Sequence, residues 1–181
     1  MVAHRTHSVL ALVLLLAVSA VAWQRRDPLT SAETDQLRET AQEPAKRLKL
    51  YLKFIGQRVA AVDKLRADPR LAGESASQIH DLLGDITSLT DELDDNIDNY
   101  AQRQADLRKP LLEVIAAETE FRQKLNALAQ ATRDPAFAAE QKTYSFTLET
   151  ATDALNSSLD HARKTLAEQE TLFKERKQKK K

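Results

Sequence analysis

Residues 79–128 read IHDLLGDITSLTDELDDNIDNYAQRQADLRKPLLEVIAAETEFRQKLNAL, and every seventh residue in this stretch is apolar or aromatic. A single heptad phase therefore runs from the first residue to the last, as in helices that pack along a seam. A second apolar set fills the other seam position, with the slow drift expected of a straight helix. The two sets are Ile79, Ile86, Leu93, Tyr100, Leu107, Val114, Phe121 and Leu128, and Leu82, Leu89, Ile97, Leu111, Ala117 and Leu125. This pattern predicts a long helix against which the rest of the chain packs.

The unbroken phase predicts one helix over residues 76–132, kinked near Pro110. An interior proline lacks the N–H that a helical hydrogen bond needs, so it bends or ends a helix. No Gly, Asn or Ser stands beside Pro110 to form a turn, which favours the kink. The predicted fold is all-α, an antiparallel bundle or coiled coil of long helices with this kinked helix at its centre. The alternative is a compact four-helix bundle in which the chain reverses near Lys109.

The two alternatives differ in what they leave exposed. A continuous central helix would be covered by one neighbour on its first half and by another on its second half, so seam residues near both ends would be incompletely covered. Exposed apolar patches of this kind usually mark association surfaces. The kinked rod therefore predicts self-association, and the compact bundle does not.

Proline and capping residues set the bounds of the other helices. Thr30 and Glu33 have the spacing of a capping box, and Pro44 suits the first turn of a helix. Asp-Pro pairs at 68–69 and 134–135 mark connections. Together these signals predict helices at about 31–41, 44–67, 76–132 and 137–173 in a single domain, residues 23–173.

Charge is segregated along the chain, although the net charge of the whole chain is zero. Residues 44–70 hold eight Lys or Arg against two Asp, whereas residues 71–102 hold eight Asp or Glu and no Lys or Arg. Opposite charges on adjacent helices select their pairing. The first predicted hairpin pairs helix 44–67 with the first half of helix 76–132, and facing residues have numbers that sum to about 144. The second pairs the last half of helix 76–132 with helix 137–173, and its apolar seam predicts a sum near 269. The predicted ion pairs of the first hairpin are Lys46–Asp98, Lys49–Asp95, Lys53–Asp91 and Arg58–Asp85.

The N-terminal residues have the order of a secretory signal peptide. Basic residues at positions 4–7 precede an apolar run at 9–17, which is short for a membrane span, and small residues end at Ala22. We expect residues 1–22 to be removed after Ala22 and the mature protein to be periplasmic or secreted, with no transmembrane segment. Arg25 and Arg26, directly after the site, leave open an uncleaved N-terminal anchor.

Motifs for catalysis, cofactor binding or metal ligation are missing from the sequence, which predicts a protein that is not an enzyme and has no cofactor. Cys is absent, which excludes disulfides and thiolate chemistry. Neither His80 nor His161 has the partner spacing of a helical metal site. The alternative is divalent-cation binding, or a carboxylate-based enzyme, on the acidic helix face 81–98. Asp94, Asn96 and Asp98 have the spacing of the first ligands of an EF-hand calcium loop, but Asn99 stands where that loop requires Gly. The sequence therefore favours an ion-paired, solvated helix face.

The C-terminal residues 174–181 are strongly basic and are predicted to form a disordered tail. Six Lys or Arg stand against one Glu, which suits electrostatic binding to an anionic surface. A simpler interpretation is a basic end that complements the dipole of the last helix. The zero net charge gives no reason to expect a specific nucleic acid. The candidate site residues are Lys174, Arg176, Lys177, Lys179, Lys180 and Lys181.

Two segments carry a resemblance. DPLT at 27–30 is followed by QEPAKRLKLY at 42–51, behind the signal peptide and ahead of the heptad helices. This arrangement resembles a group of uncharacterised secreted bacterial all-helical proteins over residues 27–173. The resemblance implies an envelope location and no particular activity. We therefore expect an exported, non-catalytic helical binding or structural protein of the bacterial envelope, whose partner is a second copy, an envelope protein or an anionic surface.

Overall fold

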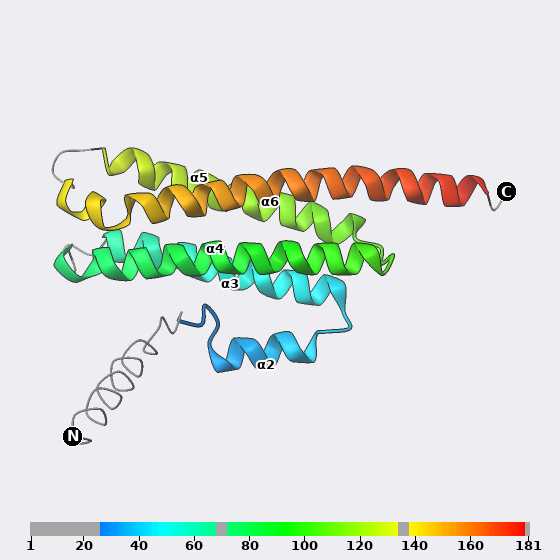
Figure 1. Cartoon of the computed structure of the whole chain (residues 1–181), viewed down its shortest axis with the longest axis horizontal. Coiled ribbons are helices and arrows are strands. Elements are labelled where there is room, and N and C mark those ends of the chain that lie inside the picture. Colours follow the sequence, from blue (N-terminus) through cyan, green and yellow to red (C-terminus); the bar gives the residue numbers. More distant parts are fainter. Residues whose placement is uncertain (1–25, 68–71, 134–137, 180–181) are drawn as a thin grey trace, which may run out of the picture.

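The computed structural model describes residues 26–67, 72–133 and 138–179, and the regular structure in these ranges is helical throughout (Figure 1). The structure is therefore all-α, as the heptad pattern predicts. The helices are α2 (Ser31–Glu39), α3 (Pro44–Ala67), α4 (Ala72–Gln102), α5 (Arg108–Ala131) and α6 (Ala138–Gln178).

The four long helices form a bundle, and α2 lies outside it along α3 (Figure 1). Both α4 and α5 pack against α3 and against α6, so α4 and α5 are diagonal to each other. The helices α3 and α4 are antiparallel, as are α5 and α6, whereas α4 and α6 run in the same direction (Figure 1). The N-terminal end of α3, the connection between α4 and α5, and the C-terminal part of α6 therefore lie at the same end of the bundle.

The predicted continuous central helix is wrong, because α4 ends at Gln102 and α5 begins at Arg108. The reversal is a Schellman motif. The backbone N–H of Ala105 donates to the carbonyl of Tyr100 at 3.0 Å, and that of Gln104 donates to the carbonyl of Ala101 at 2.9 Å. Gln104 has a φ of 61°, the left-handed conformation that this motif requires. The compact four-helix bundle, which was the alternative, is the observed arrangement.

Pro110 is the third residue of α5 and lies in its first turn. The N–H groups of a first turn have no partner within the helix, so a proline there removes no hydrogen bond. The heptad phase continues across the reversal because both helices turn their apolar side chains toward one core, and Leu107 between them is fully buried. The seam residues that a rod would leave uncovered are covered by the bundle itself, which removes that reason to expect self-association.

The other helix bounds differ from the predicted ones by a few residues. The helix α3 has the predicted bounds, α2 ends at Glu39, and α4 begins at Ala72. The largest difference is at the C-terminus, where α6 continues to Gln178, so most of the predicted disordered tail is helical. The Asp-Pro pairs at 68–69 and 134–135 and the predicted signal peptide lie outside the described residues.

The register of α3 against α4 follows the charge pattern. Arg47 Nε donates to Asn96 Oδ1 at 2.7 Å, and the Tyr51 hydroxyl donates to Glu92 Oε2 at 3.0 Å. Both pairs have residue numbers that sum to 143, one less than predicted. The predicted Arg58–Asp85 ion pair is present at 3.8 Å. The three predicted lysine pairs, Lys46–Asp98, Lys49–Asp95 and Lys53–Asp91, are not among the ion pairs of the described residues. Instead, Lys46 pairs with Glu43 at 2.5 Å, and Lys53 contacts Gln36 of α2 at 3.5 Å.

The register of α5 against α6 differs from the prediction by about one heptad. Ser158 contacts Glu118, and Arg122 contacts Asn156, so facing residue numbers sum to 276 and 278 rather than 269. A seam that repeats every seven residues matches equally well after a shift of seven. Charge is not segregated between α5 and α6, so it does not distinguish between these two registers. The apolar pattern alone therefore predicted the wrong register.

The core runs the length of the bundle and includes most of the predicted seam positions, but Leu82 and Ala117 are only partly buried, and Leu83 is fully buried in place of Leu82. From α4, the residues Ile79, Ile86, Leu89, Leu93 and Ile97 are at most 1% exposed. The capping box also forms, because Glu33 N–H donates to Thr30 Oγ1 at 3.2 Å and Thr30 N–H donates to Glu33 Oε2 at 2.8 Å. Within the described ranges, none of the helices has the length and hydropathy that crossing a membrane requires.

Candidate functional site

Of the predicted basic residues, Lys174, Arg176, Lys177 and Lys179 are described by the structure, and they lie at the end of the bundle where α4 turns into α5. The C-terminal turns of α6 project past this turn (Figure 1). A groove of about 780 Å³ lies between the first turn of α5 and the last turns of α6. Four basic side chains line it, Arg108, Lys109, Lys174 and Lys177, against the two acids Asp106 and Glu170. The remaining lining residues are Ala45, Pro110, Leu112, Leu166 and Phe173.

An arginine and an aromatic ring join the two sides of the groove. The guanidinium carbon of Arg108 lies 4.0 Å from the centroid of the Phe173 ring, a cation–π contact between α5 and α6. Arg108 also pairs with Asp106 through two hydrogen bonds, Nε to Oδ1 at 2.9 Å and Nη2 to Oδ2 at 2.7 Å. This hydrogen bonding from Arg108 holds the pKa of Asp106 below its usual value. Asp106 is therefore an anion whose charge Arg108 compensates.

The remaining lysines of the groove carry the excess positive charge. No ion pair between described residues involves Lys109, Lys174 or Lys177. All three side chains are exposed. The groove thus presents three ammonium groups and the carboxylate of Glu170 to solvent beside apolar side chains, and its net positive charge attracts phosphate or carboxylate groups.

The floor and walls of the groove are held in place by hydrogen bonds across helices. The side chain of Gln169 accepts from the Leu107 N–H at 2.9 Å and donates to the Ala105 carbonyl at 3.0 Å. Arg176 Nη2 donates to Gln104 Oε1 at 2.7 Å. The last turns of α6 are therefore anchored on the α4–α5 connection, which fixes the spacing between the basic residues of the two helices.

The structure separates the predicted site residues into three groups. Lys174 and Lys177 line the groove, Arg176 binds the connection, and Lys179 is exposed beyond the last turn of α6. Lys180 and Lys181 lie outside the described residues.

Sequence reasoning missed three residues of the groove: Arg108, Lys109 and Phe173. A usable signal exists, because Phe173 follows Leu166 by seven residues and no Gly or Pro occurs after Pro135. These features allow the last helix to continue into the basic segment, so that its lysines are held at fixed positions.

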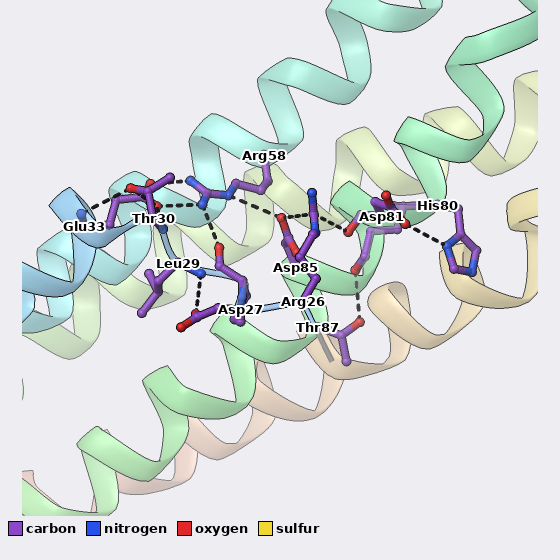
Figure 2. Close-up of polar contacts among 12 residues, drawn as sticks. Arg26, Asp27, Leu29, Thr30, Glu33, Arg58, His80, Asp81, Asp85 and Thr87 are labelled. Atoms are coloured by element: carbon purple, nitrogen blue, oxygen red, sulfur yellow. Dashed lines mark hydrogen bonds and ion pairs between the residues drawn. The ribbon is translucent and has the colours of Figure 1, made fainter. Parts of the chain in front are cut away.

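The acidic residues of the helix face 81–98 have separate partners and do not form one cluster: Asp85 pairs with arginines, Asp94 contacts Ser158, and Asp98 pairs with His161. Asp85 pairs with Arg26 at 2.6 Å and with Arg58 at 3.8 Å, and Figure 2 shows it between the two guanidinium groups. Burial nevertheless raises the pKa of Asp85, against the opposing effect of the two arginines. The part of the chain that the structure describes contains no group of three or more acidic or histidine side chains that could hold a metal ion.

Arg58 connects the N-terminal segment to the bundle (Figure 2). Its guanidinium binds both carboxylate oxygens of Glu33, with Nη2 at 2.7 Å from Oε2, and donates to the Pro28 carbonyl at 2.7 Å. The hydrogen bond from Arg58, helped by Thr30, lowers the pKa of Glu33 to about 2. The capping box of α2 is thus also the point at which α2 attaches to α3.

Comparison of the chain with protein-family models, with curated proteins and with solved structures finds no match in any of the three. The geometry of the groove and the sequence patterns are therefore the observations from which a function can be argued.

Proposed function

We propose that this chain is an exported, non-catalytic helical protein of the bacterial envelope that binds an anionic lipid surface through the basic end of its bundle. The observation that carries the proposal is the groove between α5 and α6, where Lys109, Lys174 and Lys177 are exposed beside one another. The export part of the proposal is supported by the signal-peptide pattern of residues 1–22.

The choice of a lipid surface is supported by exposed apolar residues at the same end. Leu112, which lines the groove, is 58% exposed, and Leu172 on the projecting part of α6 is 51% exposed. Basic residues interspersed with exposed apolar side chains are typical of segments that lie at a membrane interface. A soluble polyanion would contact only the lysines and would offer no apolar surface to Leu112 and Leu172.

The residues around the groove supply charge and apolar surface. Among the described residues that line the groove there is no Ser, Thr, Tyr, Cys or His, so these side chains offer ammonium, guanidinium and carboxylate groups without a hydroxyl, thiol or imidazole nucleophile. This composition supports a binding role. Electrostatic attachment of this kind contributes about 1 kcal/mol per Lys or Arg near the surface and weakens as salt is added.

The test is sedimentation of the protein with vesicles of phosphatidylglycerol and phosphatidylcholine, compared with vesicles of phosphatidylcholine alone. We expect the chain to bind the anionic vesicles selectively. Replacing Lys109, Lys174 and Lys177 together by Gln should weaken this binding on the order of 100-fold, because three contributions of about 1 kcal/mol are lost.

The matched control replaces three exposed basic residues at the opposite end of the bundle, Lys64, Arg66 and Lys142, by Gln, which changes the net charge by the same amount. This control should bind as the unmodified chain does. Equal loss in both variants would show that only net charge matters, and unchanged binding of the groove variant would refute the proposed surface. A further variant, Leu112→Ser with Leu172→Ser, should weaken binding to vesicles but not to heparin.

A further inference from the structure

A glutamate is buried in the middle of the bundle without a cationic partner. Glu118 of α5 and Ser158 of α6 are both 0% exposed. Ser158 Oγ lies 2.6 Å from Glu118 Oε1 and 2.7 Å from Asp94 Oδ1 of α4. Among the described residues Glu118 Oε2 has no hydrogen-bond partner. One hydroxyl group therefore bridges two carboxyl groups from two different helices.

The two short contacts of Ser158 Oγ require a proton on one of the two carboxyl groups. A serine hydroxyl has a single hydrogen, so it can donate to only one of two carboxylate oxygens. Two short contacts to ionised carboxylates would leave one pair of oxygens facing each other without a hydrogen. One carboxyl group must therefore carry a proton and donate it to Ser158 Oγ, while Ser158 donates to the other carboxyl group.

The charged groups of α4 and α6 identify which carboxyl group holds the proton. Asp94 is only partly buried and has His161 nearby, and His161 Nε2 in turn lies 3.0 Å from Asp98 on the surface. Burial raises the pKa of Asp94, whereas the hydrogen bond with Ser158 and the charge of protonated His161 oppose this rise. Asp94 thus has a compensating group that Glu118 lacks.

The residues of α3 also leave Glu118 without a cation. The register that sets Gly56 against the Phe121 ring places residues 51–55 of α3 near the level of Glu118. The two titratable side chains in that segment are engaged elsewhere: Tyr51 donates to Glu92 of α4, and Lys53 is exposed and reaches α2. Burial, with the charge of Asp94 adding to it, raises the pKa of Glu118 to about 8.

We propose that Glu118, Ser158 and Asp94 form a proton-dependent lock between α5, α6 and α4, which is closed while Glu118 donates a proton to Ser158 and loosens when that proton is removed. Loss of the proton leaves two carboxylates in the core sharing one hydroxyl hydrogen. Both the repulsion between them and the burial of an unpaired charge then favour separation of the helices.

The sign of the pH effect follows from the pKa of Glu118 in the two states. In the folded protein it is about 8, above the ordinary value of 4.5 that applies after unfolding. The stabilisation is therefore complete below about pH 4.5 and is lost as the pH rises toward 8. The bundle should be tightest in mildly acidic surroundings. This inference does not depend on the proposed binding of anionic lipid.

The first experiment is a ¹³C NMR titration of the chain labelled at the glutamate side-chain carboxyl groups. One glutamate signal should titrate near pH 8, and this signal should be absent from Glu118→Gln. If no glutamate of the unmodified chain titrates near pH 8, the proposal is overturned. This measurement on the unmodified chain decides the matter even if the variant fails to fold.

The second experiment compares the melting temperature of the unmodified chain with that of Glu118→Gln between about pH 5 and about pH 9. The substituted amide would keep the shape of the side chain and could donate its N–H to Ser158, so the variant should melt at a nearly constant temperature. The unmodified chain should lose roughly 5–10 °C over the same range. The matched control, Glu113→Gln at an exposed position of α5, should keep the unmodified pH dependence.

Amide hydrogen exchange tests the loosening itself. At about pH 9, after correction for the intrinsic rate, exchange should be faster in α4, α5 and α6 around the bridge than at about pH 5, and Glu118→Gln should abolish the difference. Equal protection at both pH values, or a pH dependence that persists in Glu118→Gln, would contradict the lock.

Discussion

The side chain of Gln169 on α6 accepts a hydrogen bond at 2.9 Å from the backbone N–H of Leu107, the residue that precedes α5. Gln169 is 5% exposed and Leu107 is fully buried, so water cannot replace this acceptor easily. The N–H groups at a helix start have no partner within the helix. A residue of the fourth long helix therefore satisfies a backbone group of the turn between the second and third.

Replacing Gln169 by Ala should destabilise the protein by about 1–3 kcal/mol, because it leaves the buried Leu107 N–H without an acceptor. The loss is measured by urea denaturation followed by circular dichroism. Gln123→Ala, at an exposed position of α5, is the control and should change stability by less than about 0.5 kcal/mol. An equal effect of the two variants would mean that the contact with Leu107 contributes nothing.

Replacing Pro110 by Ala tests the position of this proline in the first turn of α5. In a helix interior, removing a proline should stabilise the helix by about 3 kcal/mol. In the observed bundle Pro110 costs no hydrogen bond, so we expect a change within about 1 kcal/mol and the same compact shape in small-angle X-ray scattering. A large gain in stability accompanied by an extended shape would favour the kinked rod.

The fold class could be predicted from the sequence, but the reversal between α4 and α5 could not. Helix ends of this type usually have Gly or Asn in the left-handed position, whereas this chain has Gln104 there. That conformation costs an ordinary residue roughly 1–2 kcal/mol. Packing of Leu107 and the bond from Arg176 to Gln104 help to offset this cost. These tertiary contacts are invisible in a local sequence pattern.

The candidate site could be predicted only in part, because it also depends on tertiary contacts between distant segments of the chain. The basic composition of residues 174–181 was sufficient to identify Lys174 and Lys177. The partners of these lysines in the groove, Arg108 and Lys109, come from the start of another helix, and they join the site only because the chain reverses at the preceding connection. A prediction that placed these residues in the middle of a rod could not bring the two segments together.

The pairing of Arg58 with Glu33 predicts a loss of stability in acid. The pKa of Glu33 is lowered to about 2 in the folded protein, below its ordinary value of 4.5. Its contribution is therefore present above about pH 4.5 and is lost as the pH falls toward 2. The segment before α3 should detach first, because Arg58 also binds the Pro28 carbonyl.

Limited proteolysis as a function of pH measures this detachment. Glu33→Gln should make the region around α2 sensitive to protease already at neutral pH and should cost about 1–3 kcal/mol of stability. Asp35→Asn removes an exposed pair with Arg38 on the same helix and should behave as the unmodified chain does. Protection of α2 in Glu33→Gln equal to that in Asp35→Asn would contradict the role of the Arg58–Glu33 pair.

Two glycines inside helices provide a matched comparison of packing. A Cβ added at Gly84 of α4 would meet no atom within 4 Å, whereas one added at Gly56 of α3 would lie 3.2 Å from the Phe121 ring of α5. Alanine is favoured over glycine in a helix by about 1 kcal/mol. Gly84→Ala should therefore stabilise the protein by about that amount.

For Gly56→Ala, the same gain is opposed by displacement of the Phe121 ring, and overpacking of a core costs about 1–3 kcal/mol. We expect Gly56→Ala to be less stable than Gly84→Ala by at least about 1 kcal/mol in urea denaturation. Combining each substitution with Phe121→Leu separates the two effects. The smaller side chain should remove the difference between the glycines if ring contact causes it, and a difference that persists would mean that α3 and α5 approach each other more closely through other residues.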